Sequence, residues 1–322
     1  MDSAKFIDSV RLVEVDAESA GQRIDNFLLR FLKGVPRSHL YRVLRRGEVR
    51  VNKGRVKASH RLNAGDLVRI PPLRTSTPEP SDRAPRSQME RLERGMLYED
   101  ERLLVIDKPS GMAVHGGSGL SYGLIESLRH ARPGRELELV HRLDRETSGC
   151  LVISKRRSAL RELHRLIREG GMTKRYQALI LGELPRQKLV VDAPLKKNVL
   201  QGGERVVRVD PEQGKPARTI FRRLQRLRAG ERILTLVEAE LITGRTHQIR
   251  VHAAHLGTPL AGDPKYGDEE INRALKPLGL TRLFLHASSL RFRIEGMERA
   301  LSVDAPLPDE LAQFLAELEA TE

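Results

Sequence analysis

Residues 139–153 of this 322-residue chain read Leu-Val-His-Arg-Leu-Asp-Arg-Glu-Thr-Ser-Gly-Cys-Leu-Val-Ile. The apolar residues at both ends are typical of strands, and Thr147-Ser148-Gly149 is typical of a turn. Asp144 therefore falls where a strand gives way to a loop, from which a carboxylate can face a cleft. A single loop carboxylate more often binds nearby backbone N–H groups or pairs with a neighbour such as Arg142 or Arg145. Its role has to be judged with the other segments of the chain.

The whole chain is basic, with 57 Lys and Arg against 43 Asp and Glu and a formal net charge of +14 at pH 7. A charge of this size predicts a polyanionic partner, with nucleic acid ahead of an anionic membrane surface. No apolar run approaches the ~18 residues of a membrane helix, and residues 1–8 lack a signal-peptide core. We expect a cytoplasmic protein without membrane contact, long enough for two domains.

Cysteine and histidine usage argues against a metal or a cofactor. Cys150 is the only cysteine, which excludes an internal disulfide and a zinc site built on paired cysteines. Flanked by Gly149 and Leu151, it fits a small buried core residue better than a nucleophile. His252 and His255 have a spacing that metal ligands can have on a helix, but no carboxylate stands where a zinc hydrolase requires one.

Residues 20–73 predict a small domain of two helices followed by a hairpin. Five apolar residues recur at helical spacing in the first helix: Ile24, Phe27, Leu28, Phe31 and Leu32. Ser38 is a good N-cap for the second helix, whose apolar side is Leu40, Tyr41, Val43 and Leu44. Asn52-Lys53-Gly54 predicts a tight turn between strands, and residues 67–70 predict another strand.

The basic charge is concentrated in this small domain, because residues 21–70 contain thirteen Lys and Arg against three Asp and Glu. Arg42, Arg45 and Arg46 are spaced to form one stripe on the second helix. A solvated charged face is one interpretation, but a net +10 in fifty residues repels itself and favours phosphate binding. The order of elements and turns resembles the S4 RNA-binding domain.

The segments on either side of the small domain are less regular. Residues 1–19 carry more acid than base, and their short alternating run leaves both a strand and a loose arm open. Five prolines among polar residues in 71–85 predict an extended interdomain linker, which we assign to residues 74–94. A second domain is then expected over residues 95–322.

Three further segments of that second domain carry distinctive patterns. Residues 108–115 form a Lys-Pro-Ser-Gly turn ahead of a histidine. Tyr176 follows a basic pair in a predicted strand, where it could also be an ordinary half-buried sheet residue. Residues 244–252 read Gly-Arg-Thr-His-Gln-Ile-Arg-Val-His, in a predicted helix that Thr246 can cap and Gly257 ends.

Together with His141-Arg142-Leu143-Asp144, these segments resemble the RluA family of RNA pseudouridine synthases. The resemblance implies that Asp144 is catalytic, that Tyr176 stacks on uracil and takes the C5 proton, and that Arg250 is the active-site arginine. It also implies that Arg142 fills the space that a flipped base leaves and that Leu285 belongs to the apolar wall of the pocket. The implied fold is α+β, with a two-lobed catalytic domain around a mixed, largely antiparallel sheet and a central cleft.

The resemblance extends over residues 21–305 and is strongest to the branch that acts on bacterial 23S ribosomal RNA. It implies this RNA, or a large-subunit assembly intermediate, as partner of a protein that we expect to be monomeric. Isomerising uridine involves no redox change and no outside atom, so no cofactor is required, and Asp144 could act as nucleophile or as base. The alternative is a non-catalytic S4-type RNA-binding protein, which the charge would support equally well.

Overall fold

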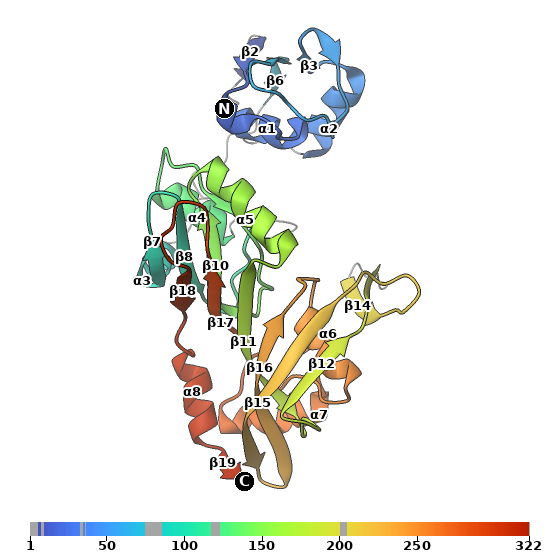
Figure 1. The fold of residues 1–322 in the computed structure, drawn as a ribbon, viewed down its shortest axis with the longest axis vertical. Coiled ribbons are helices and arrows are strands. Elements are labelled where there is room, and N and C mark those ends of the chain that lie inside the picture. Colours follow the sequence, from blue (N-terminus) through green and yellow to red (C-terminus); the bar gives the residue numbers. More distant parts are fainter. Residues whose placement is uncertain are drawn as a thin grey trace, which may run out of the picture. The chain divides into compact units, whose positions relative to one another are not determined.

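The computed structural model describes residues 6–7, 10–32, 35, 37–74, 86–116, 123–199 and 205–321. The chain divides into two compact units, residues 1–83 and 84–322, and Figure 1 labels most of their helices and many of their strands. Among the helices in these ranges, none combines the length and the apolar character needed to cross a lipid bilayer.

In its described residues the smaller unit contains two α-helices, one 3-10 helix and two small sheets. Its elements in chain order are β1 (Phe6–Ile7), β2 (Arg11–Glu14), the 3-10 helix η1 (Ala17–Ser19), α1 (Ile24–Phe31), α2 (Arg37–Arg46), β3 (Arg50–Val51), β4 (Gly54–Arg55), β5 (Leu67–Ile70) and β6 (Leu73–Arg74). The four-stranded sheet has the order β2-β5-β3-β4, and β1 pairs with β6. Residues 11–14 are therefore a strand of this unit, which decides between the two alternatives for that part of the N-terminal arm.

The two helices of the smaller unit pack their apolar sides together, with Ile24, Phe27, Leu28 and Leu40 in one buried cluster. Tyr41 was expected on this side but is 41% exposed, and its hydroxyl donates to Asp25. The helix α2 begins at Arg37, so Ser38 lies inside it and is not its N-cap. The hairpin of β3 and β4 turns at Asn52 and Lys53 as predicted, and both residues have positive φ angles.

Part of the predicted linker is a helix. Residues 75–85 lie outside the described residues, whereas residues 86–94 form α3 (Arg86–Arg94). Leu92 of α3 is fully buried and belongs to the main core of the larger unit. An extended linker over 74–94 is therefore not what the structure has, because the burial of Leu92 ties α3 to the second unit.

The larger unit is built on one long sheet. After α3 its elements are β7 (Met96–Glu99), β8 (Leu103–Lys108), α4 (Leu124–Ala131), β9 (Glu138–Leu139), β10 (Ser148–Ser154), α5 (Arg157–Glu169), β11 (Met172–Leu181), β12 (Lys188–Asp192), β13 (Leu195–Val199), β14 (Arg205–Val209), β15 (Arg218–Ala229), β16 (Arg232–Leu241), α6 (Gln248–His255), α7 (Glu269–Leu275), the 3-10 helix η3 (Lys276–Leu278), β17 (Leu285–Phe292), β18 (Leu301–Asp304), α8 (Asp309–Ala316) and β19 (Glu319–Thr321).

The sheet has eleven strands, eight of them in the order β12-β15-β16-β11-β17-β10-β8-β7, with β9, β18 and β19 pairing at its sides. Every pair in it is antiparallel except β10 with β17, where Ser148 lies opposite His286 and Gly149 opposite Ala287. The sheet is therefore mixed and largely antiparallel, and the predicted α+β class is confirmed.

The parallel contact between β10 and β17 depends on a glycine. Gly149 has φ +107°, and a Cβ atom there would lie 2.3 Å from the carbonyl oxygen of Ala287. Only glycine adopts this conformation readily and leaves room for the neighbouring strand. Ser148 and Gly149 were predicted as turn residues, but they begin β10. Gly149 is needed there because a side chain would not fit against β17.

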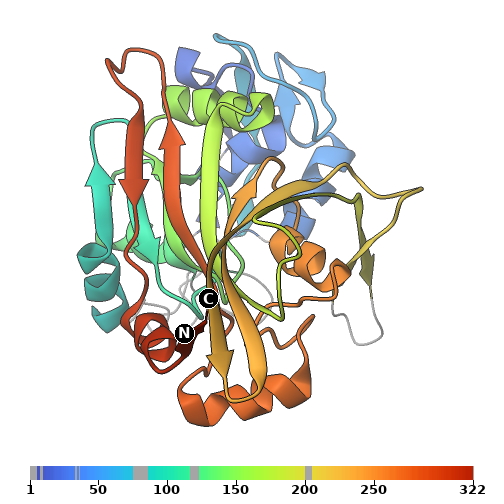
Figure 2. The same cartoon turned by 60° about the horizontal axis from the view of Figure 1, so that its bottom comes forward.

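Helices and loops cover both faces of the sheet. The main cluster on one face joins α3 and α4 to β8 and β10 at one end, and α6 to β11, β15 and β16 at the other. A second cluster packs α5 against β8 and β10, and a third packs α7 and α8 against β11, β15 and β16. Figure 2 shows α7 and α8 at one end of the strands. The two halves meet at β11 and β17, in the middle of the sheet.

Candidate active site

A pocket of about 360 Å³ opens in the larger unit, and it brings together segments that are distant in the sequence. Its lining comes from the loop after β9, from α5, β11 and β17, and from the turn that leads into α6. All five residues that the sequence singled out in this unit line it: Arg142, Asp144, Tyr176, Arg250 and Leu285. Asp144 is the only carboxylate among the described lining residues.

Asp144 lies in the loop between β9 and β10, with 19% of its side chain exposed. Residues 108–112 contact this loop through side-chain hydrogen bonds. The ammonium of Lys108 donates to the carbonyl oxygens of Pro109, Met112 and Arg145, and Ser110 donates to the carbonyl of Glu146. Burial lowers the pKa of Lys108 to about 7, against the opposing charge of Glu146, but three acceptors match the three donors of a charged ammonium. Lys108 therefore supports the loop.

Arg250, in the first turn of α6, is held in place by hydrogen bonds to Asp263 and not by Asp144. Its Nε and Nη2 atoms donate to the two carboxylate oxygens of Asp263 at 2.8 and 2.6 Å. The remaining Nη1 atom lies 3.8 Å from Oδ2 of Asp144, too far for a hydrogen bond. Burial by itself lowers the pKa of Arg250, but Asp263 and then Asp144 raise it above its usual value. The guanidinium is thus a fixed positive charge beside a free carboxylate.

His247 stands on another side of Asp144, with its Nε2 atom 3.9 Å from Oδ1. Its Nδ1 atom is 2.8 Å from the hydroxyl of Tyr266, which accepts from the backbone N–H of Val207. His247 has φ +53° and is the residue that caps α6, not Thr246 as predicted. The carbonyl oxygen of the Gln248 side chain, which accepts from Thr243 and from the backbone of Arg245, orders the turn instead.

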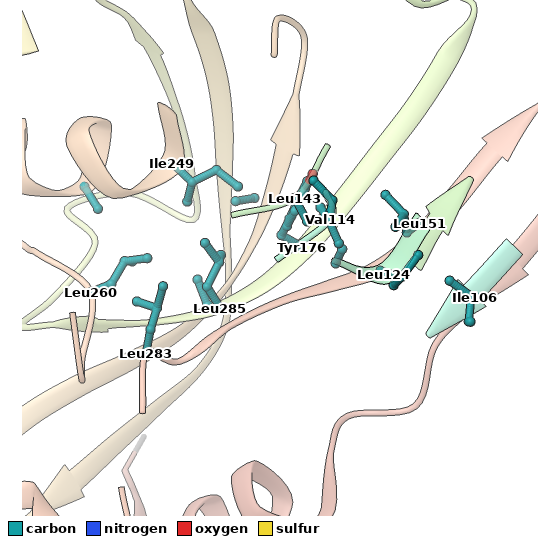
Figure 3. Close-up of a cluster of buried hydrophobic side chains, with 14 of the residues drawn as sticks. Ile106, Val114, Leu124, Leu143, Leu151, Tyr176, Ile249, Leu260, Leu283 and Leu285 are labelled. Atoms are coloured by element: carbon teal, nitrogen blue, oxygen red, sulfur yellow. The ribbon is translucent and has the colours of Figure 1, made fainter. Parts of the chain in front are cut away.

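Tyr176 and Leu285 form the apolar wall. Tyr176 is 6% and Leu285 3% exposed, and Figure 3 shows both in the main core cluster with Leu143 and Ile249. Burial, and after it the charge of Asp144, raises the pKa of Tyr176. The phenol is therefore protonated at neutral pH.

His252 and Cys150 are buried residues whose environment fits a structural role. His252 is buried, and its ring nitrogens lie 2.9 Å from the Thr219 hydroxyl and from the Ala193 carbonyl. Burial raises the pKa of the Cys150 thiol to about 12, which makes it a poor nucleophile. Within the described parts of the chain, no cluster of three or more His, Cys, Asp or Glu could hold a metal ion.

Comparisons with known proteins agree with this geometry. The model of the family described as RNA pseudouridylate synthase matches residues 102–255, and the model of the S4 domain matches residues 22–68. The ribosomal large subunit pseudouridine synthase C of Pasteurella multocida is 52% identical over 96% of this chain and 94% of its own length. The chain belongs to the RNA pseudouridylate synthase family.

Other relatives give the same assignment. Ribosomal large subunit pseudouridine synthase C of Escherichia coli strain K12 is also 52% identical, over 96% of this chain and 97% of that protein. Human RNA pseudouridylate synthase domain containing 1 has a TM-score of 0.60 and 27% identity over 72% of this chain and 90% of that structure. Human RNA pseudouridylate synthase domain containing 4 has a TM-score of 0.58 and 28% identity, over 72% of this chain and 97% of that structure.

In this pseudouridine synthase the stripe predicted on the small domain is present on the surface. Arg42, Arg45 and Arg46 are all exposed on α2, and among them Arg46 lies 3.8 Å from Glu48. The sequence alone assigned no role to Asp263, His247 or Tyr266, although His247 falls in the segment 244–252 that resembles the family. The signal that could have found Asp263 is an acidic residue in a glycine-rich segment after a helix with a buried arginine.

Proposed function

We propose that this enzyme converts specific uridines of bacterial 23S ribosomal RNA to pseudouridine, with Asp144 as the catalytic residue. The names of the relatives that are 52% identical over nearly the whole chain support ribosomal RNA as the substrate. The observation that carries the catalytic assignment is the position of Asp144. It stands alone among the described pocket residues as a carboxylate, between a fixed guanidinium and an apolar wall.

This arrangement suits an isomerisation better than a hydrolysis. Pseudouridine formation breaks the bond from the ribose to N1 of uracil, turns the base and joins the same ribose carbon to C5. A retaining glycosidase uses two carboxyl groups about 5–5.5 Å apart because it must also activate water. Here one carboxylate is adequate, either as a nucleophile on the sugar or as the base that removes a ribose proton.

Arg250 is proposed to provide a positive charge beside Asp144. Its Nη1 atom lies 3.8 Å from Oδ2 of Asp144, where opposite charges attract. Because Asp263 already occupies two edges of the guanidinium, Arg250 can supply its charge without taking the oxygens of Asp144 as hydrogen-bond acceptors. Those oxygens are left for the substrate.

Tyr176 is proposed to stack on the uracil, and Arg142 to occupy the space that the base leaves. A stacked base has to be flipped out before it can enter such a pocket, at a cost of a few kcal/mol. The exposed Arg142 side chain lies at the pocket, where it can offset part of that cost. The protonated phenol of Tyr176 can take the C5 proton only as its own proton leaves, which makes stacking the better supported role.

The S4-like domain, assigned to residues 20–73, is proposed to bind the RNA through Arg42, Arg45 and Arg46. The proposed catalytic domain extends from residue 95 to 322. We infer that the protein is a monomer that acts on 23S ribosomal RNA or on an assembly intermediate of the large subunit. We also infer that it acts in the cytoplasm, because the proposed substrate is found there.

Asp144→Asn tests the proposal. The variant should bind a 23S ribosomal RNA transcript as the unchanged enzyme does but form pseudouridine at least about 100-fold more slowly, the lower limit for a lost general base. Asp192→Asn, an exposed residue outside the pocket, is the control and should retain full activity. Turnover by Asp144→Ala would refute the assignment.

Mapping pseudouridines in 23S ribosomal RNA from cells with and without this protein tests the substrate. A site that disappears with the protein identifies the target uridine. If the two maps are the same and the purified protein nevertheless binds the RNA, the result would favour the alternative of a non-catalytic S4-type protein.

A further inference from the structure

Lys174 is a buried cation without a counter-ion. It lies on β11, is 8% exposed and lines the pocket. Among the described residues it has neither a hydrogen-bond acceptor nor a carboxylate partner, and burial lowers its pKa without an opposing acidic neighbour. Its Nζ atom is not among the fully buried polar atoms that lack a partner, so the ammonium itself reaches the pocket. A largely buried charge is costly unless it is paired, and a ligand that carries a negative charge would supply the missing partner.

The position of the ammonium is defined by its neighbours on two sides. Tyr176 lies two residues along the same strand, and alternate residues share one face at a separation of about 7 Å. On the other side a Cβ atom at Gly244 would lie 3.7 Å from the Lys174 Nζ atom. The Nζ atom thus lies beside Gly244, and both Lys174 and Tyr176 line the pocket.

Two more cations line the same pocket. Arg142 and Arg168 are both exposed, and neither has a carboxylate partner among the described residues. Burial and then Lys174 lower the pKa of His141, and the pKa of His164 is lowered by burial and by Arg168. Three cations that line one pocket without a carboxylate partner in the described part of the chain mark a place for an anionic ligand.

Asp144 does not serve as that anion. Its oxygens lie 3.8 Å from Arg250 and 3.9 Å from His247, and among the described residues no ion pair joins Asp144 to Lys174. Asp144 is also the only carboxylate among the described lining residues. The negative charge that matches Lys174 must therefore come with the ligand.

We propose that Lys174 binds a backbone phosphate flanking the target uridine, and that Arg142 and Arg168 attract this phosphate on its way in. A nucleotide that rotates out of its stack carries its own phosphodiester groups toward the pocket. Those oxygens would supply the acceptors that the ammonium lacks and favour its charged form. The inference rests on the proposed action on RNA, and it assigns to Lys174 the holding of the flipped nucleotide rather than bond breaking.

The test compares five variants of the full-length enzyme on a 23S ribosomal RNA transcript. Lys174→Met removes the charge and keeps the length of the side chain, and Lys174→Arg keeps the charge. Gly244→Asp places a carboxylate next to the Lys174 Nζ atom, while Gly244→Ala adds only the Cβ atom at an ordinary contact distance. Lys188→Met removes an exposed positive charge outside the pocket and controls for the loss of net charge.

The first measurement is the Kd for RNA over a range of KCl concentrations. Lys174→Met should raise Kd by about 10-fold, the effect of one lost hydrogen bond to a charged group, and reduce the slope of log K against log salt by about 0.7. Gly244→Asp should reproduce most of this effect, because an internal carboxylate competes with the phosphate. Lys174→Arg and Gly244→Ala should change binding less, and Lys188→Met least.

Thermal unfolding without RNA separates a ligand-binding lysine from a structural one. Removing an unpaired buried charge should raise the Tm of Lys174→Met, because residues kept for binding are commonly held at a cost in stability. A lower Tm, or an unchanged Kd and salt slope in Lys174→Met, would overturn the proposal.

The outcome is distinguishable from a failure of the proposed function, since none of these readouts requires turnover. If the unchanged enzyme forms no pseudouridine but Lys174→Met flattens the salt slope, the phosphate site stands and the proposed reaction falls. If the unchanged enzyme forms pseudouridine while Lys174→Met binds as it does, the reaction stands and the phosphate site falls.

Discussion

Asp263→Asn should destabilise the larger unit strongly, because Asp263 is the buried partner of Arg250. Its side chain is fully buried, and it accepts two hydrogen bonds from Arg250 and two from the backbone N–H groups of Lys265 and Tyr266. Asparagine has the same shape but no charge, and its amide group would present donors to a guanidinium that has only donors.

The expected cost follows from the burial of this pair. Breaking a buried ion pair by neutralising one partner costs about 3–5 kcal/mol, because the other charge is left uncompensated. In a unit of this size each kcal/mol lowers Tm by about 2–4 °C, so a fall of roughly 6–20 °C is expected. Pseudouridine formation should fall as well, since Arg250 is no longer held 3.8 Å from Asp144.

The measurement is thermal unfolding with a matched control, followed by single-turnover assays well below both Tm values. Asp192→Asn removes the carboxylate of an exposed pair with Arg218, whose side chains are 51% and 53% exposed, and should cost less than about 1 kcal/mol. A cost for Asp263→Asn within about 1 kcal/mol of that control, with an unchanged rate, would refute the reasoning.

The same pair predicts a dependence on pH. Burial by itself raises the pKa of Asp263, but Arg250 and the two backbone donors lower it below its usual value. A carboxyl group with a lowered pKa stabilises the folded state above its unfolded pKa of about 3.9, and this contribution is lost as the pH falls further. The difference in unfolding free energy between the unchanged enzyme and Asp263→Asn should therefore be largest near pH 7 and shrink below about pH 4.

Two other substitutions test the RNA-binding surface and the sheet. Replacing Arg42, Arg45 and Arg46 together by Gln should reduce the slope of log K against log salt for RNA binding by about 2. Single-turnover rates at saturating RNA should not change. An unchanged slope would show that the stripe does not contact RNA. Gly149→Ala should lower the free energy of unfolding by at least about 1–3 kcal/mol, because the new Cβ atom would collide with the Ala287 carbonyl at a residue with a positive φ. Denaturant titration measures this change. Gly230→Ala also has a positive φ but open space around the new Cβ atom, so it measures the cost of the backbone conformation without the collision.

The local patterns predicted the elements that carry the site. Alternation around Tyr176 indicated β11, and the apolar runs around Asp144 indicated strands on both sides of a loop, because these signals depend only on neighbouring residues. Long-range partners left no such signal. The pairing of Arg250 with Asp263, and the lack of a partner for Lys174, arise from how β11, α6 and the segment after it meet, which no local period encodes. Pattern alone also misassigned Gly149, whose turn-like character serves a contact with a strand 138 residues away.

The fixed position of Arg250 explains how a cation can assist Asp144 without disabling it. A free arginine next to a carboxylate tends to form two parallel hydrogen bonds with it, which would occupy the oxygens that the proposed reaction needs. In this pocket Asp263 takes that bidentate interaction, and the stacking of the guanidinium over Tyr266 at 5.1 Å further limits its movement. Asp144 is then left with a favourable field and open oxygens. If the proposed reaction is correct, Asp263 is therefore as necessary to the site as Asp144, because it holds Arg250 in the position from which the guanidinium assists Asp144.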